Sequence, residues 1–406
     1  MTTCRVCAGP CESFISFGRM PVANGFLREE DFADEYFFDL AAAFCERCAL
    51  PQLVNAVAPD RMFHGEYPFF TSSSRGMVEH FARFAAEVRS RFMPESGGLV
   101  VEIGSNDGTL LRHFIAPGVR HLGVEPSANV AVAALERGVK SVIHFFDEDS
   151  AAEILREEGD ADVVLAANCF CHVHDLHALA ANIDRVLKPR GVVVFEDPYV
   201  GDILDRNAYD QIYDEHMFYF SLAGVSRWLE GHGFEVVDVQ PQSVHGGSMR
   251  YTVARPGTRT VGDNVEALRR EERRRGLDRL DTFLRFRSRI EKSRDDLLAL
   301  LRRARREEKR VVGYAATSKS TTVLNYCGIT RELVEFICDT TLLKQGKFSP
   351  GMHIPVRPQA QFAGRYPEYA LLFAWNHARE IMANERAFEA AGGRWISYVP
   401  EVALVD

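Results

Sequence analysis

The chain has 406 residues, of which 46% are hydrophobic and 26% are charged. That composition excludes a disordered or collagen-like chain, and the length corresponds to two or three domains of about 150 residues. The 57 acidic residues outnumber the 48 basic ones, and the net charge of −9 argues against a general nucleic-acid-binding protein. No apolar run could span a bilayer, and cysteines stand where a secretory signal needs an apolar core, so we expect a cytoplasmic protein.

Five of the nine cysteines fall within the first 48 residues. Four of them form two Cys-x-x-Cys pairs: Cys4 with Cys7, and Cys45 with Cys48. Each such turn lets two thiolates converge at ~2.3 Å on one Zn²⁺, and two turns complete a tetrahedron. Because four sulfurs leave no open coordination position, we predict a structural zinc site in a domain over residues 1–65. Cys11 is a poorer ligand because of its longer spacing, and reduced unpaired thiols are the alternative to a metal site.

The next segment, residues 66–96, predicts a helix, because apolar residues recur at three- and four-residue steps from Met77 to Val88. Strand-like and helix-length segments then alternate, which is typical of a doubly wound parallel sheet. The strands are predicted at residues 99–103, 121–124, 141–145, 163–166 and 191–195. We therefore predict an α/β domain over residues 66–260.

The first predicted strand runs into a glycine-containing turn that ends at Gly108. Gly104 and Gly108 let the backbone approach a ligand, and an open parallel sheet binds its ligand beyond the carboxyl ends of its strands. The spacing is not Gly-x-Gly-x-x-Gly, so the dinucleotide fingerprint is missing. Glu102 precedes the turn and Glu125 ends the next strand, and this arrangement resembles the class I S-adenosylmethionine-dependent methyltransferases. A packing glycine and a surface carboxylate are the alternative interpretation.

That resemblance implies a cofactor site along the strand ends. Glu125 would accept hydrogen bonds from the two ribose hydroxyls, Phe146 and Asp147 would lie near the adenine, and Asn168 would lie near the methionine end. The full predicted set is Glu102, Gly104, Asn106, Gly108, Glu125, Phe146, Asp147 and Asn168.

A dense polar and aromatic segment, residues 209–221, follows the fifth predicted strand. His216 can take a proton at neutral pH, and a tyrosine hydroxyl can donate to a developing oxyanion. His172, Tyr213 and Glu215 are expected near the same edge of the sheet. Together these side chains favour catalysis over the alternative, a structural histidine with satisfied hydrogen bonds.

The rest of the chain predicts a long amphipathic helix or helical pair over residues 262–310, followed by a second α/β unit. Residues 269–310 carry a local charge of +8, which we interpret as a solvated helix face rather than a nucleic-acid patch. Between a strand and a helix, Ser318 and Lys319 present small-residue backbone and a positive charge suited to a diphosphate. An ordinary helix cap is the alternative there.

Nearly the whole chain resembles one family, the sugar C-methyltransferases that methylate carbon 3 of nucleotide-linked 4-keto-6-deoxy sugars in antibiotic and cell-surface sugar biosynthesis. Besides the paired cysteines, the resemblance rests on Tyr67-Pro68-Phe69-Phe70, Glu102-Ile103-Gly104-Ser105-Asn106-Asp107-Gly108, Tyr213-Asp214-Glu215-His216, His245-Gly246-Gly247-Ser248-Met249-Arg250 and Gly313-Tyr314-Ala315-Ala316-Thr317-Ser318-Lys319. It implies a zinc-binding N-terminal domain, a cofactor domain, and a Rossmann-like C-terminal α/β domain (with the helical connector, residues 261–406) that helps to hold the nucleotide sugar.

The resemblance also implies a reaction. His216 would abstract the proton on carbon 3, with Glu215 orienting or tuning it, and Tyr213 and Tyr67 would hydrogen-bond the ketone oxygen at carbon 4. His172 is a second candidate base or a sugar contact. The candidate substrate contacts are His245, Arg250, Ser318, Lys319 and Lys347.

The methyl donor would be S-adenosylmethionine, and the acceptor a dTDP- or GDP-linked keto sugar. We expect no nucleic-acid or membrane partner, and a monomer. Two alternatives stay open: an O- or N-methyltransferase acting on another small metabolite, and a zinc-dependent binding module with an inactive methyltransferase domain.

Overall fold

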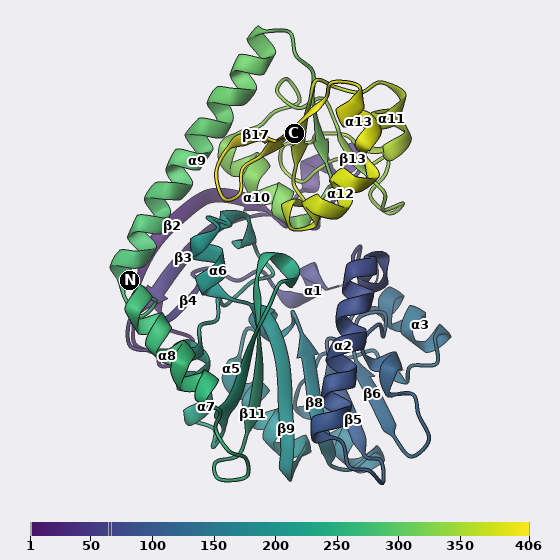
Figure 1. Cartoon of the computed structure of the whole chain (residues 1–406), viewed down its shortest axis with the longest axis vertical. Helices are drawn as coiled ribbons and strands as arrows, with labels where there is room; N and C mark the ends of the chain where they lie inside the picture. Colours follow the sequence, from purple (N-terminus) through teal and green to yellow (C-terminus); the bar gives the residue numbers. More distant parts are fainter. Residues whose placement is uncertain (1, 64, 66, 406) are drawn as a thin grey trace.

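The computed structural model describes residues 2–63, 65 and 67–405 and contains three β-sheets (Figure 1). Their strand orders are β1-β2-β3-β4, β10-β11-β9-β8-β5-β6-β7 and β14-β13-β12-β15-β16-β17. In Figure 1 the seven-stranded sheet lies at the bottom, the C-terminal sheet at the top, and the N-terminal strands lie along the long helix α9. Within the described ranges no helix is both long and apolar enough to cross a membrane.

The N-terminal sheet is an antiparallel meander of β1 (Thr2–Thr3), β2 (Pro10–Pro21), β3 (Phe37–Cys45) and β4 (Leu50–Leu53). It packs on α9 (Leu280–Arg306), where the ring of Phe283 lies 4.4 Å from that of Phe44 and 5.2 Å from that of Phe14. The buried side chains of this sheet belong to the same apolar cluster as those of the following units. The N-terminal unit is therefore built into the molecule rather than attached to it by a linker.

The central sheet confirms the predicted α/β class. Its parallel strands are β5 (Leu99–Ile103), β6 (Arg120–Val124), β7 (Ser141–Val142), β8 (Ala161–Ala167) and β9 (Leu187–Pro198), and β10 (Glu235–Gln242) and β11 (Ser248–Ala254) add an antiparallel edge. Its helices are α2 (Arg75–Phe92), α3 (Ala128–Glu136), α4 (Glu148–Glu157), α5 (Leu176–Val186), α6 (Val200–Asp205) and α7 (Leu222–Glu230), after the short α1 (Pro59–Met62). The apolar stripe of α2 packs on one face of the sheet, as its periodicity predicts.

Two local expectations in this sheet need correction. The third strand is shorter than residues 141–145, since the chain leaves the sheet after Val142. The helix-length segment between the first two predicted strands contains a single 3₁₀ turn, Leu111–Phe114, rather than an α-helix. Pro117 follows closely, and a proline disfavours helical geometry in the residue before it.

The C-terminal sheet has parallel strands β12 (Val311–Tyr314), β13 (Ile337–Asp339), β14 (Val356–Pro358), β15 (Tyr369–Leu372) and β16 (Arg394–Ser397), with β17 (Ala403–Val405) antiparallel at the edge. Its helices are α10 (Ser318–Cys327), α11 (Gln359–Gly364), α12 (Ala378–Asn384) and α13 (Arg386–Ala390). Further 3₁₀ turns lie at Glu29–Asp34, Thr71–Ser73, Phe170–His172, Tyr209–Gln211, Val244–Gly246 and Trp375–His377.

The predicted helical connector is a pair, α8 (Asp263–Arg275) and α9. Gly276 separates the two helices at φ +68°, a left-handed position that a glycine adopts without strain and that ends α8. One acidic side chain of α8 is not on a solvated face: the buried Glu272 carboxylate accepts hydrogen bonds from the backbone N–H of Leu222 (2.7 Å) and Ala223 (3.0 Å). It thereby joins α8 to the N-terminus of α7.

Candidate functional site

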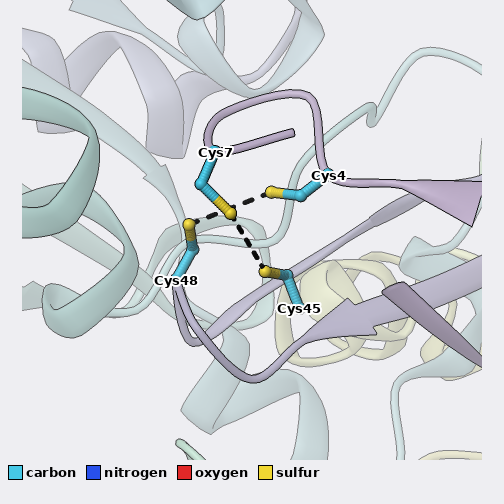
Figure 2. Close-up of side chains that lie close together, drawn as sticks. All are labelled: Cys4, Cys7, Cys45 and Cys48. Atoms are coloured by element: carbon cyan, nitrogen blue, oxygen red, sulfur yellow. Dashed lines mark hydrogen bonds between the residues drawn. The ribbon is translucent and has the colours of Figure 1, made fainter. Parts of the chain in front are cut away.

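Four cysteine side chains converge beside the N-terminal sheet (Figure 2). The Sγ atoms of Cys4 and Cys48 are 3.9 Å apart, and those of Cys7 and Cys45 are 3.6 Å apart. A tetrahedral Zn²⁺ with Zn–S bonds of ~2.3 Å holds its sulfurs about 3.8 Å from one another, so this donor set fits zinc. The fifth cysteine of the region, Cys11, is buried and does not belong to this group of four.

A cavity of about 660 Å³ opens at the carboxyl ends of the central strands and is closed by segments of the N-terminal and C-terminal units. Most of the residues predicted from the sequence line it: Tyr67, Glu102, Gly104, Asn106, Glu125, Phe146, Asn168, His172, Tyr213, Glu215, His216, His245, Ser318 and Lys319. Gly108, Asp147, Arg250 and Lys347 do not. The tertiary structure therefore brings candidate cofactor, catalytic and substrate residues to one cavity.

The glycine turn shapes one end of this cavity. Gly104 has φ +70°, and a Cβ there would come within 2.7 Å of the Cys169 Sγ, so only glycine fits. The next strand end supplies Glu125, whose carboxylate accepts hydrogen bonds from the N–H of Asn106 (3.0 Å) and Ser127 (2.8 Å). Burial raises the pKa of Glu125. These bonds hold the carboxyl group in place on the cavity wall.

Several cavity-lining polar atoms lack partners within the described part of the chain, and Glu102 Oε2 and Asn168 Oδ1 are two of them. Both are acceptors at strand ends, and burial raises the pKa of Glu102. A buried acceptor without a donor is costly, so a ligand that brings hydroxyl and ammonium donors suits this end of the cavity. The ribose and amino-acid groups of S-adenosylmethionine are donors of that kind.

Three of the predicted residues that lie outside the cavity have other roles. Gly108 packs closely, since a Cβ there would lie 2.8 Å from the side chain of Val139. Asp147 caps α4 by accepting from the N–H of Ser150 at 2.9 Å. Lys347 lines a neighbouring groove of about 770 Å³ instead.

Arg250 differs most from its expected role as a substrate contact. Its Nε donates to Glu196 Oε1 at 2.6 Å, its Nη1 lies 2.7 Å from Glu87 Oε2, and its guanidinium stacks 3.8 Å from the Phe84 ring centroid. His80 bonds the other Glu196 oxygen at 2.7 Å. Arg250 and His80 thus pin α2 to the sheet, because Glu196 on β9 is fully buried between them.

We predict that Arg250→Met lowers the free energy of unfolding by about 3–5 kcal/mol, because it leaves the Glu196 carboxylate buried without its cation. Denaturant unfolding measures the change, and Arg274→Met, at an exposed ion pair with Glu271, is the control that should change little. Full stability of Arg250→Met combined with lost activity would restore the substrate-contact role.

His216 is buried and its imidazole is neutral. Its Nδ1 lies 2.8 Å from the backbone oxygen of Gln211, and since a carbonyl only accepts, Nδ1 carries the proton. Its Nε2 therefore accepts from the Tyr213 hydroxyl, 2.8 Å away. Burial lowers the pKa of His216 well below the usual range, so the imidazole is unprotonated at neutral pH. The site thus offers a basic nitrogen and a phenol in direct contact.

His172 stacks beside this pair, with its ring centroid 5.2 Å from that of His216. Its Nε2 has no hydrogen-bond partner among the described residues. Burial lowers its pKa to about 4. Both histidines are therefore weaker bases than an exposed histidine, and His172 differs from His216 in having no orienting partner on Nε2 among the described residues.

Glu215 does not orient His216, contrary to expectation. Its carboxylate accepts instead from Asn24 Nδ2 at 2.6 Å and from the Tyr67 hydroxyl at 3.3 Å, and the Gln211 carbonyl holds the histidine. Burial raises the pKa of Glu215 to about 7, against the effect of these two donors. While Glu215 is ionised, the Tyr67 proton is directed at Glu215 rather than at a ligand.

The sequence reasoning missed several cavity residues. Asn24, Gln211, Asn376 and His377 line the cavity, but none belongs to a motif that marks it. Asn376 has its Oδ1 3.4 Å from the Nζ of Lys319, which also lies 5.0 Å from the Trp375 ring centroid. Gln211 lies within the polar and aromatic segment, residues 209–221, and that position is the sequence feature that could have identified it as a cavity residue.

Comparison with known proteins covers the chain in three parts. Family models described as "Putative zinc binding domain", "Methyltransferase domain" and "C-methyltransferase C-terminal domain" match residues 4–63, 77–239 and 243–400. C-methyltransferase NovU of Streptomyces niveus is 36% identical over 99% of this chain and 96% of its own length. Ubiquinone biosynthesis O-methyltransferase of Rhodopseudomonas palustris (strain BisA53) is 29% identical over 24% of this chain and 39% of its own.

Solved structures similar to part of the chain include the glycopeptide N-methyltransferase MtfA complexed with S-adenosylmethionine, at 16% identity and a TM-score of 0.34 over 43% of this chain and 94% of that one. Magnesium protoporphyrin IX methyltransferase of Synechocystis PCC 6803, with bound S-adenosylhomocysteine, has 13% identity and a TM-score of 0.34 over 44% and 84%.

Proposed function

The chain belongs to the family of S-adenosylmethionine-dependent C-methyltransferases, with a zinc-binding N-terminal part, and from that premise we propose that it methylates carbon 3 of a nucleotide-linked 4-keto-6-deoxy sugar through an enolate. The observation that carries the proposal is the contact between neutral His216 and the Tyr213 hydroxyl inside the cavity that also holds Glu125. When bound, S-adenosylmethionine supplies an electrophilic methyl group on sulfur.

His216 is the proposed base. A hydrogen on the carbon beside a ketone becomes acidic enough to remove when the enolate oxygen is stabilised. Nε2 of His216 takes that proton, while Nδ1–H stays on the Gln211 carbonyl, whose dipole stabilises the imidazolium. The Tyr213 hydroxyl, released from Nε2, donates to the ketone oxygen at carbon 4. Carbon 3 of the enolate would then bond to the methyl group in place of its lost hydrogen, and the electron pair of the broken sulfur–methyl bond would stay on sulfur as a neutral thioether.

The C-terminal unit is proposed to hold the diphosphate of the nucleotide sugar. Ser318 and Lys319 begin α10 at the cavity wall, where backbone N–H groups and the ammonium favour an anion. Burial lowers the pKa of Lys319, and the charge of Asp210 opposes that effect. A diphosphate would add further negative charge and keep the ammonium protonated. We also propose the domain bounds 1–65, 66–260 and 261–406.

The proposed function predicts hydrogen exchange without methyl transfer. The protein, incubated in deuterated water with dTDP- or GDP-linked 4-keto-6-deoxy sugars and no methyl donor, should replace the carbon-3 hydrogen by deuterium, seen by NMR. Adding S-adenosylmethionine should convert the same sugar to its 3-C-methyl product.

The same sugars reduced at carbon 4 are the control and should not exchange, because they form no enolate. Methylation at oxygen or nitrogen without exchange would replace the proposal by an O- or N-methyltransferase. Inactivity with every keto sugar would remove it.

A further inference from the structure

A loop of the zinc-binding N-terminal part enters the active-site cavity. It follows β2, and its tip is Ala23-Asn24. The N–H of Ala23 donates to Asp214 Oδ1 at 2.9 Å, and the carbonyl of Ala23 accepts from the Thr321 hydroxyl at 2.8 Å. Asp214 belongs to the polar and aromatic segment, residues 209–221, and Thr321 belongs to α10, so the loop is fixed between the other two parts of the chain. Asn24 is thereby held in the cavity wall.

The Asn24 side chain makes the shortest contact of the Glu215 carboxylate. Its Nδ2 donates to Oε1 at 2.6 Å, while the Tyr67 hydroxyl donates to Oε2 at 3.3 Å. Glu215 is 2% exposed, so these two side chains are its main hydrogen-bond donors. The orientation of this carboxylate is therefore decided by two residues from outside its own segment.

We propose that Asn24 is a positioning residue of the active site: its amide holds the Glu215 carboxylate and, through it, the Tyr67 hydroxyl in the cavity wall. The inference rests on the proposed function. It gives the zinc-binding part a role in the reaction besides its own folding, because Asn24 reaches the cavity only when β2 and its loop are in place.

The groups around Glu215 show what removing the amide would do. Four ionisable side chains interact with the charge of Glu215: Asp214, Tyr213, Tyr67 and Cys171. The ammonium of Lys344 interacts with it with the opposite sign. Burial raises the pKa of Glu215 to about 7, while the donors Asn24 and Tyr67 and the charge of Lys344 oppose the rise. Loss of a donor to the charged form raises the pKa of a carboxyl further.

Asn24→Leu tests the proposal, because leucine keeps the size of the side chain and removes the donor. Titration of Glu215 should produce one limb of the pH–rate profile for carbon-3 exchange, near pH 7 in the wild type. In the variant this limb should move up by about one to two pH units. The Kd for S-adenosylmethionine and the melting temperature should stay near their wild-type values. Asn55→Leu, at an exposed asparagine of the same part of the chain, is the matched control and should leave the profile unchanged.

An unchanged pH profile in Asn24→Leu would overturn the proposal, whatever happened to the overall rate. If Asn24→Leu melts early, Asn24→Ala serves instead. If the wild type exchanges no sugar, the proposed function fails by itself, and a titration of carboxyl ¹³C-labelled glutamate, with Glu215 assigned through Glu215→Gln, still decides the inference. Equal Glu215 titration in wild type and variant would contradict it.

Discussion

His216→Asn should slow both carbon-3 exchange and methyl transfer by about 10²–10⁴-fold, the usual contribution of a positioned general base. The asparagine amide can still donate to the Gln211 carbonyl in place of Nδ1–H, but it offers no basic nitrogen to carbon 3. His216 is distant from Glu125 in the sequence, and the two side chains have different hydrogen-bond partners. The Kd for S-adenosylmethionine should therefore not change. Exchange followed by NMR, with cofactor binding followed by calorimetry, separates the two effects.

His172→Asn is the comparison that identifies the base. His172 shares the cavity and stacks on His216, but its Nε2 has no orienting partner among the described residues. We expect a smaller loss than for His216→Asn, mainly in the Michaelis constant. A loss as large as that of His216→Asn, with exchange also abolished, would transfer the role of base to His172.

The pH dependence of the proposed base, His216, has a defined direction. Burial lowers the pKa of His216, so the neutral form is present at and above neutral pH and is lost only when the pH falls through that lowered value. The Glu215 limb, near pH 7, should therefore lie above the limb that reports His216.

Features with a local signal were predictable from the sequence. The alternation of strand and helix patterns gave the α/β class, because buried parallel strands are short apolar runs whatever they pair with. The Cys-x-x-Cys turns and Gly104 were also predictable, since their roles depend on the spacing of residues a few positions apart. Strand ends also predicted the cavity, because the carboxyl ends of parallel strands meet at one edge.

Pairings between distant segments were not predictable. Arg250 sits in a motif next to proposed ligand-binding residues, but its partners Glu196 and Glu87 lie on a neighbouring strand and on α2. Asn24 and Glu215 are 191 residues apart, and nothing in either local sequence marks the other. A pattern of neighbours along the chain indicates which face of an element is buried, but not which side chain of another element meets it.

The zinc cluster connects these two kinds of feature. Its four cysteines form two local pairs beside β2 and β3. These strands carry the rings that pack on Phe283, and β2 leads into the loop that holds Asn24. Loss of the metal should therefore disturb the reaction as well as the N-terminal sheet.

Cys45→Ser should remove the zinc and lower the melting temperature, with carbon-3 exchange lost as well. A serine hydroxyl replaces a thiolate at the end of β3, and structural zinc contributes about 10–16 kcal/mol to the folding of small zinc peptides. Because the N-terminal sheet shares one apolar core with the rest of the chain, its loss exposes the packing face of α9 and withdraws Asn24 from Glu215. Metal analysis, thermal unfolding and the exchange assay measure the three effects.

Cys11→Ser is the matched control, since Cys11 is buried beside the cluster but is not one of its four cysteines. It should retain one zinc per chain, with a small decrease in melting temperature from the buried hydroxyl. Full zinc content in Cys45→Ser, or equal loss from both variants, would contradict the four-cysteine assignment. Loss of zinc from Cys45→Ser with exchange at the wild-type rate would support the four-cysteine assignment. It would contradict the dependence of the active site on the N-terminal loop.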